Sequence, residues 1–147
     1  MPRGFTLVEL LVVLVLIGIS AGLISLALRD PSESRLEQEG TRLAALLEAG
    51  RAEARALGLP VRFELGSTVP GDGFRFVGLP PQLKLPQRWL NEETQAEIVG
   101  ARALQLGPEP IIGPQRIALR LGERQLLLAT DGLGPFAPLP TEATSPP

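Results

Sequence analysis

The chain has no cysteine, no histidine and no tyrosine, and Lys84 is its only lysine. Without histidine and cysteine it lacks imidazole bases, thiol nucleophiles and the usual zinc ligands. Serine and threonine are not activated as nucleophiles in the usual way without such a base. We therefore expect no enzymatic activity, no metal site and no cofactor.

Net charge is also small, at −2 from 14 basic and 16 acidic side chains. This near-balance argues against a protein that binds nucleic acid or anionic membranes over its whole surface. Carboxylate-rich segments are sparse as well. Asp72 and Asp131 each follow the pattern of a turn aspartate rather than a calcium site, which needs six or more oxygens. Glu92, Glu93 and Glu97 are interpreted as solvated residues of a loop or short helix.

The longest feature present is an apolar run of 24 residues from Phe5 to Leu28. As a helix it would extend roughly 36 Å, which is enough to cross the hydrocarbon core of a bilayer. The run ends at Arg29-Asp30-Pro31, and Arg3 precedes it. These flanking residues predict a single membrane pass over 5–28, with the amino terminus in the cytoplasm and the rest of the chain exported.

Residues 31–58 predict a second, amphipathic helix. Asp30 is the expected N-cap and Pro31 the first helical residue. Pro31 would either separate the two helices or kink a single long one. One face of the second helix is apolar, with spacings of three and four residues. It comprises Leu36, Gly40, Leu43, Leu47, Gly50, Ala54 and Leu57.

After Pro60 the pattern changes to short alternating runs separated by glycine and proline. Strands are predicted at 61–65, 74–77, 101–106, 116–121 and 125–130, with Gly122-Glu123 as a two-residue hairpin turn. Residues 80–100 are assigned to a loop, and 141–147 to a disordered tail. The fold class is therefore α+β: a long amino-terminal helix packed on a small antiparallel sheet domain of four to six strands, over residues 59–140.

Glu9 is unusual because it is a charged residue one helical turn inside the apolar run. Such a charge costs about 2.5–3.5 kcal/mol near mid-bilayer and commonly marks a functional site. Three interpretations are open. The segment could be a secretory signal cut after Ser25-Leu26-Ala27, which would release a periplasmic binding or adhesion module. It could be a simple anchor. Alternatively, cleavage after Gly4 would give Phe5 a free α-amine that a Glu9 carboxylate, in the same or a neighbouring helix, could neutralise.

The stretch Gly4-Phe5-Thr6-Leu7-Val8-Glu9, followed by an unbroken apolar run, resembles the processing signature of type IV pilins and type II secretion pseudopilins. The segments RLAALLEAGRAEARALGLPVRFEL and LLLATDGLGPFAPL resemble minor members of the H-type or FimT-like branch. Many relatives carry a proline near the end of the membrane segment, whereas this chain has Leu26 there. The resemblance covers residues 4–28 strongly, 41–65 and 125–139 moderately, and nothing between.

This resemblance implies a structural subunit of a pilus or a secretion filament. Residues 1–4 would be a leader removed by prepilin peptidase, Phe5 would be N-methylated, and Glu9 would serve subunit assembly. The implied partners are other pilins or pseudopilins, the peptidase, the inner-membrane assembly platform and membrane lipid. The implied location is the bacterial inner membrane with a periplasmic domain, then a surface or periplasmic filament.

Because FimT-like pilins are associated with DNA uptake, arginines near the predicted hairpin are candidate DNA contacts. They are Arg116, Arg120 and Arg124. However, residues 32–147 hold 12 basic and 14 acidic groups, whereas phosphate binding requires a basic surface. No aromatic stacking platform accompanies these arginines. Solvated strand arginines are therefore the favoured interpretation.

Overall fold

A computed structural model describes residues 4–27, 31–66 and 73–139. The chain divides into two compact units, Met1–Pro31 and Ser32–Pro147. The first contains helix α1 (Leu7–Ala27). None of the helices in the described ranges combines the length and the hydropathy that crossing a membrane requires.

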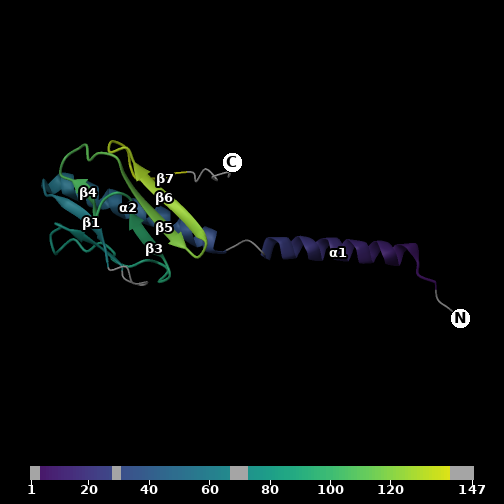
Figure 1. The fold of residues 1–147 in the computed structure, drawn as a ribbon. Coiled ribbons are helices and arrows are strands. Elements are labelled where there is room, and N and C mark those ends of the chain that lie inside the picture. The colour runs from purple at the N-terminus through teal and green to yellow at the C-terminus, as the bar shows by residue number, and fades with distance from the viewer. Residues whose placement is uncertain (1–3, 28–30, 67–72, 140–147) are drawn as a thin grey trace. The chain divides into compact units, whose positions relative to one another are not determined.

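The second unit contains helix α2 (Pro31–Leu57) and seven strands among its described residues (Figure 1). They are β1 (Val61–Leu65), β2 (Phe74–Val77), β3 (Gln95–Ile98), β4 (Ala103–Gly107), β5 (Gln115–Leu121), β6 (Arg124–Thr130) and β7 (Ala137–Leu139). All pair in antiparallel fashion. The α+β class is confirmed, but the strands form two sheets rather than the predicted one, in the orders β2-β1-β4 and β3-β5-β6-β7.

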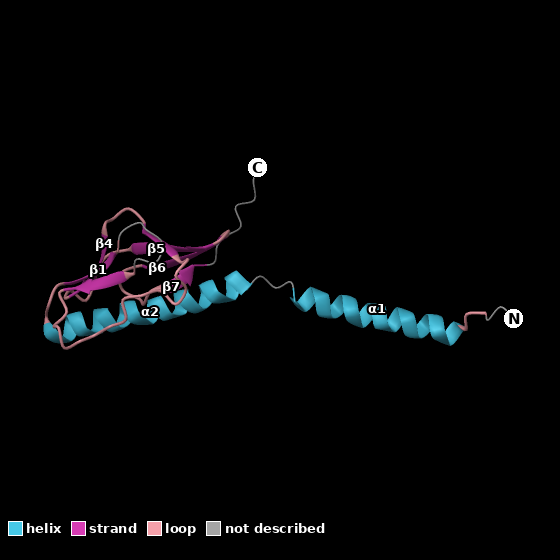
Figure 2. Ribbon diagram, turned by 90° about the horizontal axis from the view of Figure 1, so that it is seen from below, coloured by secondary structure: helices cyan, strands magenta, loops and turns pink. Residues whose placement is uncertain are grey.

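Helix α2 lies along one face of both sheets, as Figure 2 shows. Its predicted apolar face is buried from Leu36 to Ala54, against sheet residues such as Phe63 and Leu119. Leu57 is the exception, because it is 46% exposed at the end of the helix. There Gly58 adopts a positive φ of 64° and Leu59 N–H donates to Ala54 O at 3.1 Å. This is a Schellman-type end, for which glycine has the required conformational freedom.

The predicted β5–β6 hairpin is confirmed, since Leu121 pairs with Arg124 across the two-residue turn Gly122-Glu123. One other assignment differs. The segment assigned to a loop contains β3, whose four residues alternate polar and apolar side chains and pair with β5. Asp30, the expected cap, and residues 141–147, the expected tail, lie outside the described residues, as does the junction where a break or a kink was predicted.

Close approach of α2 to the sheets depends on two glycines. A Cβ on Gly50 would lie 3.0 Å from both Leu106 Cδ1 and Phe76 Cε1, and one on Gly40 would clash with Leu126 Cδ2. Residues at these helical positions therefore face the sheets directly. At the gap between the sheets, the Gln115 side-chain amide donates to Gln105 O (2.9 Å) and accepts from Gln105 N–H (2.6 Å).

Two buried charged residues on α2 were not anticipated from the sequence. The side chain of Glu39, 1% exposed, accepts hydrogen bonds from the N–H groups of Leu90 (2.7 Å) and Asn91 (3.4 Å). Arg42, one turn on, forms an ion pair with Glu39 at 3.2 Å and donates to Arg88 O at 3.0 Å. This pair ties the connection after β2 to the helix.

Arg51 makes the corresponding contact at the other end of α2. It is 1% exposed and donates to the carbonyls of Gly134 (2.7 Å), Gly132 (2.8 Å) and Leu133 (3.4 Å). Glu48, one turn earlier, is 3.5 Å from Arg51 and accepts from Phe136 N–H at 3.1 Å. Buried charges are tolerated because each is paired and hydrogen-bonded to backbone.

Candidate processing and assembly site

The amino-terminal signature lies where α1 begins. Helix α1 starts at Leu7, and Thr6 is its N-cap: Thr6 Oγ1 accepts from Glu9 N–H at 3.3 Å, and Leu10 N–H donates to Thr6 O at 3.2 Å. Glu9 is thus the third helical residue, so Thr6-Leu7-Val8-Glu9 has the sequence of a capping box. A carboxylate at this position is also favoured by the helix dipole. The T-x-x-E spacing could have revealed this structural role from the sequence alone.

The Gly4–Phe5 peptide bond lies before the helix. Residues 4–6 have no regular secondary structure, Gly4 has no atom within 4 Å of its Cβ position, and Phe5 is 73% exposed. A protease needs an accessible, unwound backbone, and a bond inside α1 would first require helix opening. The local geometry therefore leaves the bond after Gly4 accessible to cleavage.

Phe5 and Glu9 are not on one helix in this chain, because Phe5 precedes the first helical turn. The prediction that Phe5 and Glu9 lie one turn apart on the same helix face is therefore wrong for the uncleaved chain. The reason is the Thr6 cap, which sets the helix start two residues later than predicted. An α-amine created at Phe5 would belong to a non-helical segment next to the helix N-terminus.

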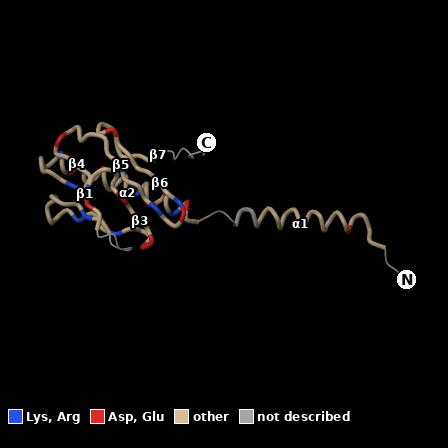
Figure 3. Tube along the Cα trace, viewed as in Figure 1, with Lys and Arg blue, Asp and Glu red and all other residues tan. Residues whose placement is uncertain are grey.

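The surface of α1 is apolar on all sides. Every residue from Gly4 to Leu23 is exposed, and Glu9 is the only charged residue between Leu7 and Ala27. Figure 3 shows this contrast, with the charged residues concentrated in the second unit and a single acidic residue along the described part of α1. A helix that is apolar all round presents a surface that favours contact with other apolar groups.

The three arginines considered for DNA contact do not share one surface. Arg116 and Arg120 alternate with the buried Ile117 and Leu119 on β5, so they lie on the face turned away from α2. Arg124 pairs with Leu121 in register and therefore shares the α2 side. There its Nη2 is 3.7 Å from Glu33 Oε2. The predicted group is divided between two faces.

Asp131 is engaged in a turn. Its Oδ1 accepts from Gly134 N–H (2.7 Å) and Leu133 N–H (2.9 Å), and these bonds, that of Gly134 first, lower its pKa below the usual 3.8. Glu92 and Glu93 lie in a turn before β3 and Glu97 lies on β3. Within the described ranges no three acidic residues cluster as metal ligands would, and Asp72 falls outside those ranges.

Comparison with known proteins adds one finding about this amino terminus. No curated protein and no solved structure matches the chain. Residues 2–25, however, match the family model of the prokaryotic N-terminal methylation motif. The matched stretch contains Gly4, Phe5 and Glu9 and ends inside α1. It supports a type IV pilin-like protein whose precursor is processed at its amino terminus.

Proposed function

We propose that the chain is a minor pilin or pseudopilin, a structural subunit of a type IV pilus or a type II secretion filament. Prepilin peptidase would cut after Gly4 and methylate the new amine of Phe5. The sheet domain would lie in the periplasm and later on the filament. The observation that carries this proposal is the methylation-motif match over an accessible Gly4–Phe5 bond, followed by a capped apolar helix with one carboxylate.

The role proposed for Glu9 follows from electrostatics. In apolar surroundings an unpaired carboxylate costs about 2.5–3.5 kcal/mol. The Phe5 amine of the same chain precedes the helix, whereas Glu9 is within it. We assign Glu9 to the amine of a neighbouring subunit, which would fix the longitudinal register of adjacent helices. Before assembly, residues 5–28 would anchor the subunit in the inner membrane; this part rests on the apolar sequence of the segment alone.

One measurement tests the proposed cleavage and methylation together. Mass spectrometry of the protein isolated from its host should give a chain that begins at Phe5 and is heavier by one methyl group. Gly4→Val should leave the precursor uncut, because a branched side chain beside the bond hinders access of the peptidase. A mature chain that begins at Leu28 would instead establish the secreted binding or adhesion module, released by signal peptidase after Ser25-Leu26-Ala27.

Two variants separate the effect of the Glu9 charge from the effect of its position in the helix cap. Glu9→Gln removes the charge but leaves a side chain that suits this capping-box position. Thr6→Ala removes the cap acceptor and leaves the charge. We expect processing of both variants, with filament incorporation lost in Glu9→Gln and retained in Thr6→Ala. Normal incorporation of Glu9→Gln would exclude the assignment, and failure of Thr6→Ala alone would make Glu9 a capping residue.

Gene deletion distinguishes the two filament systems. Loss of transformation would favour a pilus subunit of the FimT-like type, and loss of protein secretion a pseudopilin of the H type. DNA contact forms no part of this proposal, because Arg116 and Arg120 lie on one face of the sheet and Arg124 on the other.

A further inference from the structure

The outer edge of strand β2 is open at Phe76. It pairs with β1 on one side only, in the sheet order β2-β1-β4. Phe74 N–H points to the outer side, where it donates to Gln87 O at 2.9 Å. Because backbone groups alternate along a regular strand, the N–H and C=O of Phe76 face the same outer side. No hydrogen bond joins these two groups to any residue in the described ranges.

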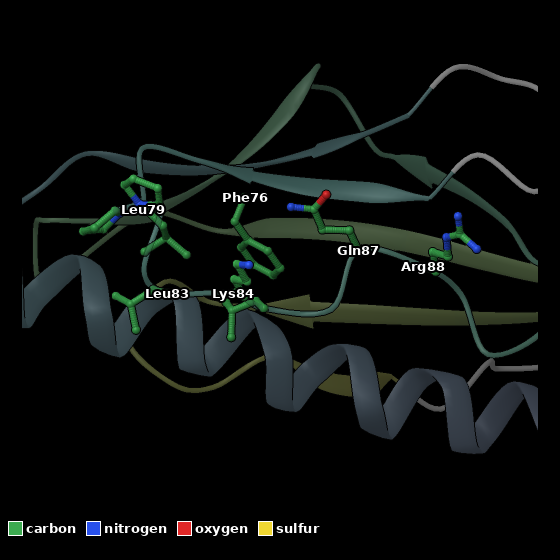
Figure 4. A pocket seen from close by; sticks show the side chains of 9 residues that line it. Phe76, Leu79, Leu83, Lys84, Gln87 and Arg88 are labelled. Atoms are coloured by element: carbon green, nitrogen blue, oxygen red, sulfur yellow. The ribbon is translucent and has the colours of Figure 1, made fainter.

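A cavity lies beside this edge. It has a volume of about 600 Å³ and is lined by Phe76 and by residues of the connection 79–88, as Figure 4 shows. The Phe76 side chain extends from β2 toward the part of the connection that carries Leu83 and Lys84. Leucine and proline side chains supply the apolar lining, while Lys84, Gln87 and Arg88 supply the polar groups.

Prolines explain why the connection does not close this space itself. It runs back past β2 and meets the strand edge through Gln87 O. Pro80, Pro81 and Pro86 lack the N–H groups that a continuous ladder with β2 would need. At Phe76 the edge is therefore left available to another strand, whereas the gap beside β4 is bridged by the Gln115 amide.

Two cations border the cavity without an acidic partner in the part of the chain that the structure describes. Lys84 and Arg88 are exposed, and neither side chain forms an ion pair or hydrogen bond with a described residue. Two nearby arginines are paired instead: Arg75, on the same strand as Phe76, binds Glu64 at 2.8 Å, and Arg42 binds Glu39 at 3.2 Å. Among the described residues, the charge that borders the cavity is thus positive.

We propose that the β2 edge binds an extended acidic segment of a partner protein, which adds a strand beside Phe76. Backbone hydrogen bonds to Phe76 would supply affinity, apolar side chains would enter the cavity, and carboxylates would meet Lys84 and Arg88. The occupant is a peptide rather than a nucleic acid, because a free strand edge offers alternating donors and acceptors that pair with peptide backbone. The site does not depend on cleavage after Gly4 or on filament assembly.

The test uses the full chain in non-ionic detergent and a short fluorescent peptide of alternating valine and glutamate, with binding followed by anisotropy. The charge-reversed pair Lys84→Glu/Arg88→Glu should weaken binding by at least about tenfold. The matched pair Arg116→Glu/Arg120→Glu, which changes net charge equally on exposed residues of the other sheet, should leave affinity within about twofold. Fluorescence of Trp89, the only tryptophan, reports whether each variant remains folded.

Two peptides N-methylated at alternate residues separate strand addition from simple charge attraction. Methylation of the amides that face β2 should abolish binding, and methylation of the opposite set should preserve it. Equal binding of both methylated peptides, no binding of the unmodified peptide, or equal loss in the Arg116/Arg120 pair would each overturn the proposal. So would tighter binding of a single-stranded oligonucleotide that displaces the peptide, since the cations would then serve phosphate.

Discussion

Helices α1 and α2 follow one another in the sequence, yet their side chains have different surroundings. In α1 every residue from Leu7 to Leu23 is exposed. Its one charged residue, Glu9, forms no ion pair with a described residue. In α2 a leucine face is buried, and even the charged Glu39 and Arg51 form hydrogen bonds with backbone of the same chain. An exposed apolar helix requires other molecules around it, whereas α2 already has its partners.

This difference predicts which property a substitution in each helix should change. Changes in α2 should first lower the free energy of unfolding of the second unit. Changes in α1 should leave that unit folded and alter processing or assembly instead. Urea titrations of the full chain in non-ionic detergent test this directly, because Trp89 is buried against Phe74 at 4.7 Å between ring centroids and reports on the second unit.

Arg51→Met should have the largest effect. It removes three hydrogen bonds from a buried guanidinium to the carbonyls of Gly132, Leu133 and Gly134, which hold this turn against α2. We expect a loss of about 3 kcal/mol or more in unfolding free energy. Arg51→Lys should recover only part of it, because an ammonium lacks the planar fork that reaches several carbonyls. Arg55→Met, on an exposed residue one turn later, is the control, and equal losses at the two positions would refute the assignment.

Glu39→Ala should have the next largest effect. It leaves the N–H groups of Leu90 and Asn91 without their acceptor and Arg42 without its ion pair. The expected loss is about 2 kcal/mol. Glu37→Ala removes the same functional group from an exposed position of the same helix and should cost less than about 0.5 kcal/mol. If the two variants unfold at the same urea concentration, the connection after β2 is not held by Glu39.

Gly50→Ala and Gly18→Ala compare the two helices with one substitution. At Gly50 a new methyl group lies 3.0 Å from Leu106 and Phe76, whereas at Gly18 nothing lies within 4 Å. Alanine gains about 1 kcal/mol of helix propensity at either site, but at Gly50 the buried neighbours must move, which costs more than this gain. We expect a net loss near 1 kcal/mol for Gly50→Ala, and unchanged Trp89 unfolding for Gly18→Ala.

The same contrast explains what the sequence could predict. The β5–β6 hairpin and the apolar face of α2 were accessible because alternation, helical spacing and a Gly-Glu turn are local signals. The buried roles of Glu39 and Arg51 were not, since their partners are backbone groups 51 and 81 residues away. On an isolated helix both look like solvated charges.

At the candidate site, the residues that could be predicted were again those that belong to a local sequence motif. Gly4, Phe5 and Glu9 were identified from a short contiguous motif, and residues 2–25 match the methylation-motif family model. The helix start was predicted two residues too early because the Thr6 cap was overlooked. Strand β3 was missed because its four residues gain their stability from pairing with β5, about 20 positions later in the chain.

Asp131 gives the smallest expected effect, and it is one of pH. Hydrogen bonds from Gly134 N–H and Leu133 N–H lower the pKa of this carboxyl in the folded chain. A lowered pKa means that the ionised form is favoured by folding, so its contribution is complete above the unfolded value near 3.8 and is lost as pH falls through the folded value. In Asp131→Asn the side-chain oxygen can still accept both bonds but cannot titrate. Below pH 3.8 the urea midpoint of the wild type should therefore fall toward that of the variant. If the two midpoints instead differ by the same amount at all pH values, these hydrogen bonds do not favour the ionised carboxylate.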